Sequence, residues 1–173
     1  MEESVSKGIS PFLRWAGSKR QIVSTLLQYW SNNFSGYIEP FAGSACLFFR
    51  LRPQRAILAD INAELILTYI QVKEHLLDVI HALRTFKGGP AEYYKVRSLD
   101  SAGLSQSERA ARFIYLNRFC FNGLYRTNLN GKFNVPYGGE KAGDLPSEDL
   151  LRTCSAALQR AISLPPFAAA DRP

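Results

Sequence analysis

The sequence lacks a long apolar run and is poor in cysteine. Crossing a bilayer takes roughly 18 consecutive apolar residues, and no stretch of the 173-residue chain comes near that length. Cys46, Cys120 and Cys154 are odd in number, lie far apart and form no Cys-x-x-Cys pair. These absences argue against a membrane span, a disulfide framework and a metal site, and they favour a cytoplasmic protein in a reducing compartment.

Acidic side chains are fewer than basic ones. Lys and Arg total 21 against 15 Asp and Glu, a net charge of +6 at pH 7. Between residues 112 and 141, basic residues are interleaved with aromatic ones: Arg112, Phe113, Tyr115, Arg118, Phe119, Phe121, Tyr125, Arg126, Lys132, Phe133, Tyr137 and Lys141. Cations displace counterions from phosphates and rings stack on bases, so this pattern is typical of a nucleic-acid surface. The alternative is a solvated basic face over an aromatic core.

The first third of the chain predicts the start of a parallel α/β sheet. A helix is expected over residues 18–30, with Ser18 as its cap. Residues 36–40 predict a strand, residues 41–44 a tight turn, and residues 45–51 a short helix capped by Ser44. A second strand over residues 56–60 is too apolar to be an exposed edge. The order strand, glycine turn, helix, strand is typical of a parallel sheet with crossover helices.

The middle of the chain predicts helices and loops. Asn62 is placed to cap a long helix with apolar positions up to Leu83. Ser105 and Glu108 form a capping-box pattern, and Asn130-Gly131 is a hairpin turn signal between residues 127–129 and 132–135. Residues 147–162 have a helical spacing again.

These elements predict three parts. Residues 10–61 form the N-terminal part of an α/β domain, and residues 62–146 form an insert that is helical and bears a β-hairpin. Residues 147–173 return toward the α/β domain.

Gly43 and Asp60 suggest a nucleotide-cofactor site. A glycine turn between a strand and a helix presents backbone N–H groups to a ligand. Asp60 ends the second predicted strand, where a carboxylate accepts hydrogen bonds from ribose hydroxyls. A single glycine is a weak signal, because a plain tight turn at Gly43 and a helix cap at Asp60 explain the same residues.

Four segments, in this order and spacing, closely resemble the Dam-like, D12-class DNA adenine-N6 methyltransferases. They are Pro11-Phe12-Leu13-Arg14-Trp15-Ala16-Gly17-Ser18-Lys19-Arg20, Glu39-Pro40-Phe41-Ala42-Gly43-Ser44, Leu58-Ala59-Asp60-Ile61-Asn62, and Tyr115 to Asn128 continuing to Gly131-Lys132-Phe133-Asn134-Val135-Pro136-Tyr137-Gly138. The fourth is long and specific. The resemblance implies a Rossmann-like catalytic domain that uses S-adenosylmethionine (SAM), with an inserted helical DNA-binding domain that carries a β-hairpin. It also implies methyl transfer to N6 of an adenine that is flipped out of double-stranded DNA.

The resemblance implies roles for residues of the cofactor site. Trp15 and Lys19 match SAM-contacting positions, where an indole offers an apolar face and an ammonium meets a carboxylate. Phe41 and Gly43 match the loop under the cofactor, and Asp60 matches the acidic residue at the ribose. Core packing is the alternative role for Trp15.

The resemblance also implies DNA contacts. Arg118, Asn122 and Arg126 match polar positions of the hairpin, and a guanidinium at Arg126 reads guanine N7 and O6 together. Arg14 matches a basic residue that contacts the DNA, and Asn122 and Asn128 match phosphate-contacting or turn residues. Phe121 matches an aromatic residue that wedges into the base stack. Leu124 and Pro136 match apolar residues that contact a thymine methyl. Hairpin core is the alternative role for Phe121. The motif is most similar to that of GATC methylators.

The sequence departs from the family at the catalytic motif. Asp-Pro-Pro-Tyr is absent, so no catalytic residue is assigned. Leu164-Pro165-Pro166-Phe167 is interpreted as a coincidence, because it follows a predicted helix with no strand to present it and leucine accepts no hydrogen bond. Ser18 and Ala45 stand where family members often have glycine.

We expect an incomplete Rossmann-like domain whose last residues look foreign, and we expect no methyl transfer by this chain alone. The alternatives are one half of a split enzyme completed by a second polypeptide, a non-catalytic DNA-binding remnant, and a dinucleotide-binding oxidoreductase domain. The motif from Trp15 to Lys19 and the Asn-rich hairpin argue against the last of these.

Overall fold

A three-stranded parallel sheet carries the cofactor motifs. The computed structural model describes residues 8–164. Its strands are β1 (Tyr37–Glu39), β2 (Ala56–Ala59) and β3 (Ala161–Leu164), in the order β1-β2-β3. Ile57 pairs with Ile38 on one side and with Ile162 on the other. The central place of β2 confirms that it is not an edge strand, as its apolar sequence predicts.

The strand β3 overturns one expectation from the sequence. Helix α7 (Glu148–Leu158) is capped by Ser147 and ends well before Ile162. The chain then joins the sheet, where the Ala56 N–H donates to the Arg160 carbonyl over 3.1 Å and β3 runs parallel to β2. A strand therefore does precede Pro165, and the prediction of a helix running directly into that segment is wrong. The apolar residues of β3 continue the helical spacing of α7, so the sequence pattern did not distinguish this strand of four residues from the helix. Residues 165–167 lie outside the described residues.

The N-terminal helix predicted over residues 18–30 is two short pieces. A 3-10 turn η1 (Lys19–Ile22) is capped by Ser18, as predicted, and α1 (Val23–Leu27) follows. Helix α2 (Cys46–Leu51) comes after the glycine turn.

The predicted cap of α2 is wrong. Its first flanking residue is Ala45, which lies in the left-handed region with φ of 50° and makes no side-chain cap. Ala45 comes two residues after Gly43. The Ser44 hydroxyl forms a hydrogen bond with the Ser18 hydroxyl, with 3.0 Å between the two Oγ atoms.

The helical half begins at Asn62, which caps α3 (Ala63–Glu74) by accepting from the Leu65 N–H at 3.1 Å. The long helix predicted here is split at His75, after which α4 (Leu76–Arg84) begins. The remaining elements are α5 (Pro90–Ser98), η2 (Ser101–Gly103), α6 (Gln106–Phe119), η3 (Phe121–Gly123) and η4 (Gly139–Lys141). The capping box of Ser105 and Glu108 at α6 is confirmed.

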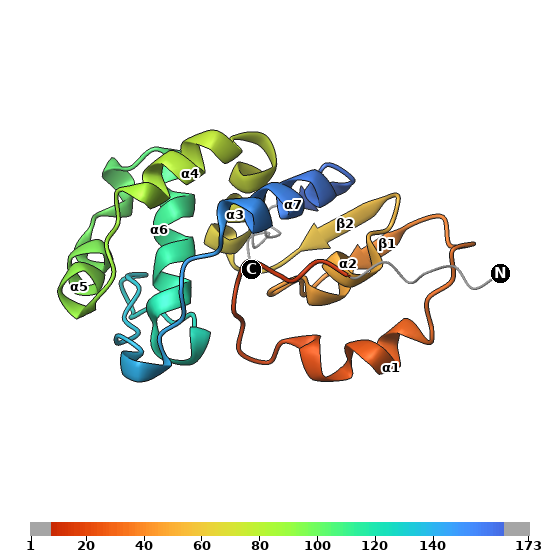
Figure 1. Ribbon diagram of the computed structural model, residues 1–173, viewed down its shortest axis with the longest axis horizontal. Helices are drawn as coiled ribbons and strands as arrows, with labels where there is room; N and C mark the ends of the chain where they lie inside the picture. The colour runs from red at the N-terminus through yellow and green to blue at the C-terminus, as the bar shows by residue number, and fades with distance from the viewer. Residues whose placement is uncertain (1–7, 165–173) are drawn as a thin grey trace, which may run out of the picture.

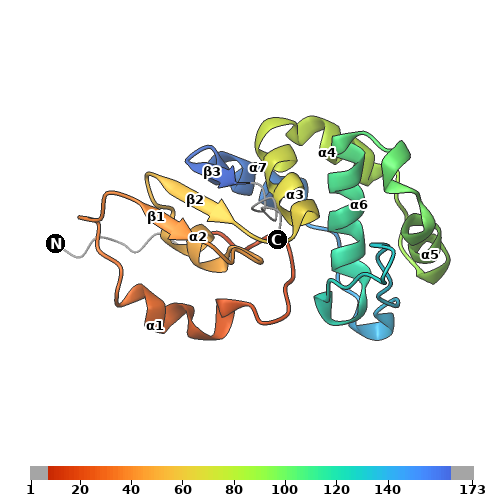
Figure 2. The same ribbon diagram turned by 180° about the vertical axis from the view of Figure 1, so that it is seen from behind.

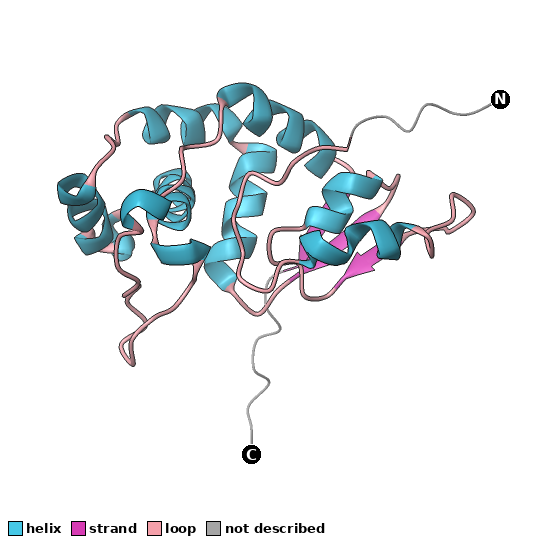
Figure 3. Cartoon of the chain, turned by 60° about the horizontal axis from the view of Figure 1, so that its bottom comes forward, coloured by secondary structure: helices cyan, strands magenta, loops and turns pink. Residues whose placement is uncertain are grey.

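Helices α3 and α7 lie between the sheet and the other helices. In Figure 1 the sheet with α1 and α2 forms one end of the molecule, and α4, α5 and α6 form the other. Turned around, Figure 2 shows β3 beside β2 and next to α7. Figure 3 shows how small the sheet is beside the helices and loops.

One contiguous hydrophobic core joins the two ends. The ring of Phe12 lies 5.6 Å from Tyr69 of α3 and 6.2 Å from Phe49 of α2, edge to face in both cases. The same cluster continues through Ile114 of α6 to Leu151 of α7. The division of the chain after residue 61 stays a prediction.

The cap of α3 generates a stability prediction. Replacing Asn62 by Ala leaves the Leu65 N–H without its side-chain acceptor, and we expect a loss of about 1 kcal/mol in the free energy of unfolding. Asn62→Ser keeps an oxygen at the cap and should lose at most half as much. Urea unfolding followed by circular dichroism measures both, and equal losses for the two variants would contradict the assigned cap.

Candidate functional site

The turn at Gly43 is held on three sides. Its N–H donates to Asp60 Oδ2 over 3.0 Å, and its carbonyl accepts from the buried Tyr69 hydroxyl over 2.6 Å. On the third side a Cβ at this position would lie 2.7 Å from Cδ1 of Trp15. With φ of +50° as well, both the backbone conformation and the space at Trp15 require glycine here.

Asp60 directly follows β2, where the carboxyl ends of β1 and β2 meet. Its second oxygen, Oδ1, accepts from the Asn62 N–H over 3.0 Å. The carboxylate therefore braces the glycine turn and the start of α3 at once. Each oxygen has a further lone pair, and the half-buried side chain remains accessible to a ligand hydroxyl.

Lys19 reaches the same edge of the sheet. Its Nζ donates to Glu39 Oε1 over 2.9 Å and to the Phe41 carbonyl over 2.8 Å. Glu39 is only 3% exposed, and its other oxygen accepts from the Tyr37 hydroxyl over 2.8 Å. Burial, followed by the charge of Glu39, raises the pKa of Tyr37 well above its usual range, so the phenol stays a donor.

Sequence reasoning missed Glu39 as a site residue. The sequence feature that could have identified Glu39 is its position at the end of a predicted strand, directly before Pro40. A buried carboxylate needs a cation and hydrogen-bond donors, and Lys19 and Tyr37 supply them.

Two large apolar side chains are exposed beside this edge. Phe41 follows β1 and is 77% exposed, and Ile61 follows β2 and is 89% exposed. Ile61 follows Asp60 directly in sequence, and the Phe41 carbonyl accepts from Lys19 Nζ. The edge therefore combines apolar surface with a cation and a carboxylate, as small-molecule sites combine apolar lining with a few polar groups.

Trp15 connects the glycine turn to the helical half. Its ring is stacked with Phe113 of α6, at 6.5 Å between centroids, and with Tyr125 at 6.4 Å. The indole is half-buried and also faces Gly43. Trp15 thus packs against the core, which was the alternative role, at the place where the predicted cofactor contact lies.

Arg14 is fixed to the end of α6 by a side chain that sequence reasoning missed. The Arg14 N–H donates to Asn117 Oδ1 over 2.8 Å, and Asn117 Nδ2 donates to the Arg14 carbonyl over 2.7 Å. The Arg14 guanidinium donates further to the Arg118 and Lys141 carbonyls. The buried side-chain amide of Asn117 therefore satisfies both backbone polar groups of Arg14, the residue before Trp15.

The predicted hairpin is present as a loop with isolated bridges and not as two strands. Thr127 pairs with Phe133, and the Asn128 N–H donates to the Lys132 carbonyl over 2.9 Å. Gly131 turns the chain with φ of +71°, as the Asn-Gly signal predicts. Asn128 Oδ1 accepts from the N–H groups of Asn130 and Lys132, each over 3.0 Å, so a side chain holds the turn.

The predicted DNA contacts divide by location. Arg126, Asn128 and Pro136 are exposed on the hairpin, and Leu124 is half-buried against the core. Phe121, at 42% exposure, and Asn122 belong to the 3-10 turn η3 that precedes the hairpin. Arg118 lies in the last turn of α6 and not on the hairpin.

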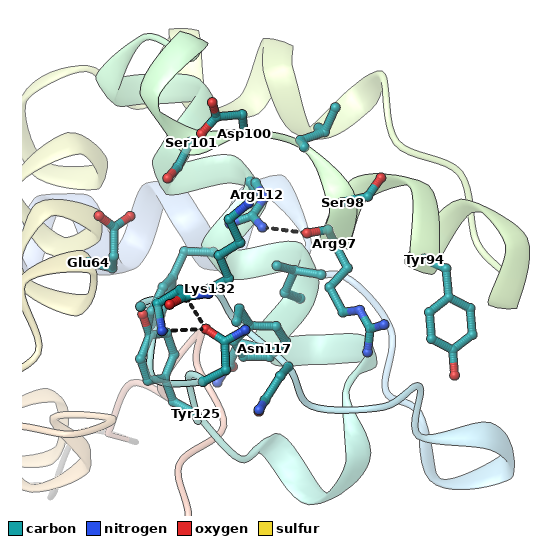
Figure 4. Close-up of a pocket in the computed structure, with 18 residues that line it drawn as sticks. Glu64, Tyr94, Arg97, Ser98, Asp100, Ser101, Arg112, Asn117, Tyr125 and Lys132 are labelled. Atoms are coloured by element: carbon teal, nitrogen blue, oxygen red, sulfur yellow. Dashed lines mark hydrogen bonds between the residues drawn. The ribbon is translucent and has the colours of Figure 1, made fainter.

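A polar pocket of about 680 Å³ lies between α5, α6 and the hairpin. Asn128 and Lys132 line it together with Arg112, which belongs to the basic and aromatic pattern of residues 112–141, and with Arg97, which sequence reasoning did not single out. Figure 4 shows Arg112 bonded to Arg97, whose carbonyl accepts from Arg112 Nη2 over 2.8 Å. Burial lowers the pKa of Arg112 from its usual value. The pocket therefore presents basic groups beside the hairpin.

Residues 8–164 contain no candidate for a membrane span or for a metal centre. No helix there has the length and apolar character that crossing a bilayer requires. No three side chains of His, Cys, Asp or Glu in that range are grouped to hold a metal ion. All three cysteines are free and buried.

The family model for D12 class N6 adenine-specific DNA methyltransferases matches residues 15–168. The chain belongs to this family. Members of the family are N6 adenine-specific DNA methyltransferases, which are enzymes. The resemblance seen in the four motifs is thereby confirmed.

Relatives of this D12-class chain come from several organisms. A type II methyltransferase of Lactococcus lactis subsp. cremoris is 39% identical over 85% of the chain and 54% of its own length. A DNA adenine methylase of Haemophilus influenzae is 37% identical over 89% of the chain and 55% of its own length. The chain thus spans about half the length of the curated relatives it matches.

The close approach of Trp15 generates a second prediction. Gly43→Ala places an alanine in the left-handed region, which costs about 1–2 kcal/mol. Its Cβ also clashes with the indole of Trp15. Gly131→Ala is the matched control, because its φ is +71° but nothing lies within 4 Å of the added Cβ. We expect Gly43→Ala to lower the free energy of unfolding by clearly more than Gly131→Ala in urea titrations. Equal losses would show that Trp15 does not restrict this turn.

Proposed function

We propose that the chain binds SAM at the Gly43 turn and double-stranded DNA through the hairpin, for methyl transfer to adenine N6. The observation that carries the proposal is the position of Trp15, which touches Gly43 on one side and Phe113 and Tyr125 on the other. A methyltransferase needs its cofactor loop and its DNA-reading segment at a fixed separation. The stacked indole supplies a rigid connection of this kind.

The residues at the edge of the sheet fit SAM. Lys19 has an ammonium for the carboxylate of the cofactor, Asp60 has lone pairs for the ribose hydroxyls, and Phe41 and Ile61 offer apolar surface to the adenine. SAM supplies the methyl group when it is bound. The described residues hold and orient the cofactor, with Glu39 keeping Lys19 at the end of β1.

The hairpin fits double-stranded DNA. Arg126 is exposed and its Nε donates to Asn134 Oδ1 over 2.8 Å, so its guanidinium is held in one orientation. A held guanidinium bonds the two acceptors of a guanine at once. Phe121 is exposed enough to enter a base step, which is what extruding an adenine requires. A GATC-like site and a cytoplasmic location, where such DNA lies, are part of the proposal.

The cofactor assignment is tested at Phe41, because this side chain is exposed and its removal leaves the core intact. Phe41→Ala should raise the SAM dissociation constant about tenfold, equivalent to about 1.4 kcal/mol, in isothermal titration calorimetry. Leu77→Ala on α4 is the control, since Leu77 is 66% exposed on another element. Binding of SAM that is equal in both variants would remove Phe41 from the site.

The DNA assignment is tested at Arg126. Replacing it by Ala should cost about 1–3 kcal/mol of binding and relax the preference at one base pair. Fluorescence anisotropy with duplexes that vary each position of a GATC site measures both effects. A uniform loss over all sequences would make Arg126 a phosphate contact, and no binding of any duplex by the native chain would refute the DNA proposal. The expectation that this chain alone transfers no methyl group stays a prediction.

A further inference from the structure

A second hollow lies between the cofactor loop and the end of α6. Its volume is about 390 Å³. Among its lining residues are three arginines, Arg14, Arg20 and Arg118, and no Asp or Glu. Ser44 of the glycine turn and Asn122 of η3 also line it, so it touches both proposed binding regions. A concave, one-sign surface of this kind concentrates ligands of the opposite charge.

Backbone carbonyls hold the guanidinium groups of two of these arginines, Arg14 and Arg118. Arg14 Nη1 donates to the Arg118 and Lys141 carbonyls, and Arg118 Nε donates to the Asp144 carbonyl over 2.6 Å. Within residues 8–164 none of the three forms an ion pair with a carboxylate. Backbone carbonyls orient a guanidinium but leave its net charge uncompensated.

The charges also act on one another. Burial, followed by the charge of Arg14, lowers the pKa of Arg118, and Arg20 acts in the same direction while Asp144 opposes it. The repulsion between like charges that the fold holds close together decreases when an anion binds between them. A phosphate suits this role because a guanidinium donates to two of its oxygens at once.

We propose that this hollow binds one backbone phosphate of the target DNA and that Arg20 is a phosphate-contacting residue outside the hairpin. The inference rests on the proposed DNA binding. Arg20 lies in η1, one residue after Lys19, so a phosphate held there sits between the cofactor loop and η3. The contact would hold the DNA strand beside the Gly43 turn, in addition to the contacts proposed for the hairpin.

The test uses Arg20→Gln and measures duplex affinity as a function of salt. Each neutralised phosphate contributes about 0.9 to the slope of log K against log salt. We expect Arg20→Gln to weaken binding of all duplexes about three- to tenfold at 100 mM salt and to lower the slope by about 1. Arg20→Lys keeps the charge and should retain the native slope. Arg152→Gln, on the exposed face of α7, is the control and should change neither quantity.

The outcomes separate this inference from the proposal beneath it. Binding of the native chain together with an unchanged slope for Arg20→Gln overturns the phosphate site alone. Absence of duplex binding by the native chain overturns both. A loss of SAM affinity in Arg20→Gln, measured by calorimetry without DNA, identifies the anion as the carboxylate of the cofactor and likewise overturns the phosphate assignment. Circular dichroism of each variant verifies that Arg20, which is exposed, is not needed for folding.

Discussion

The placement of the Gly43 backbone is the constraint on which the rest of the site depends. Gly43 donates its N–H to Asp60, and its carbonyl accepts from the Tyr69 hydroxyl, so the residue that follows strand β2 and a residue of helix α3 both fix it. Burial raises the pKa of the Tyr69 phenol well above its usual range, and the phenol therefore remains a donor throughout the ordinary pH range. Because the turn cannot move without breaking these bonds, its surface for a ligand is formed before the ligand arrives.

Trp15 extends this constraint into the helical half of the molecule. The indole needs the space that Gly43 leaves open, and its position beside Phe113 and Tyr125 follows from that contact. Gly123 leaves space for Arg14 in the same way, since a Cβ at Gly123 would lie 2.6 Å from Cβ of Arg14. Gly43 and Gly123 thus leave room for the segment Arg14-Trp15, and that segment sets the distance between the Gly43 turn and η3.

Local signals in the sequence were sufficient for much of this arrangement. The strands before Pro40 and Asp60, the cap at Asn62 and the capping box at Ser105 each depend on neighbouring residues, and all were predicted correctly. The strand β3 was missed because four apolar residues after a helix continue its spacing, and only pairing with β2 distinguishes the two. Glu39 and Asn117 were missed for a related reason. Their partners are chosen by the fold, and a polar side chain does not reveal a distant partner in its own sequence context.

The amide of Asn117 has a consequence for how the chain reaches this structure. Its two hydrogen bonds join residues that are 103 positions apart in sequence. Closing so long a loop is entropically costly and slow compared with forming a helix. The segment at Arg14 contacts Phe49 and Tyr69 through Phe12, but its two bonds to Asn117 form only after α6 exists. The backbone at Arg14 is therefore expected to reach its final position late, after α6 has folded.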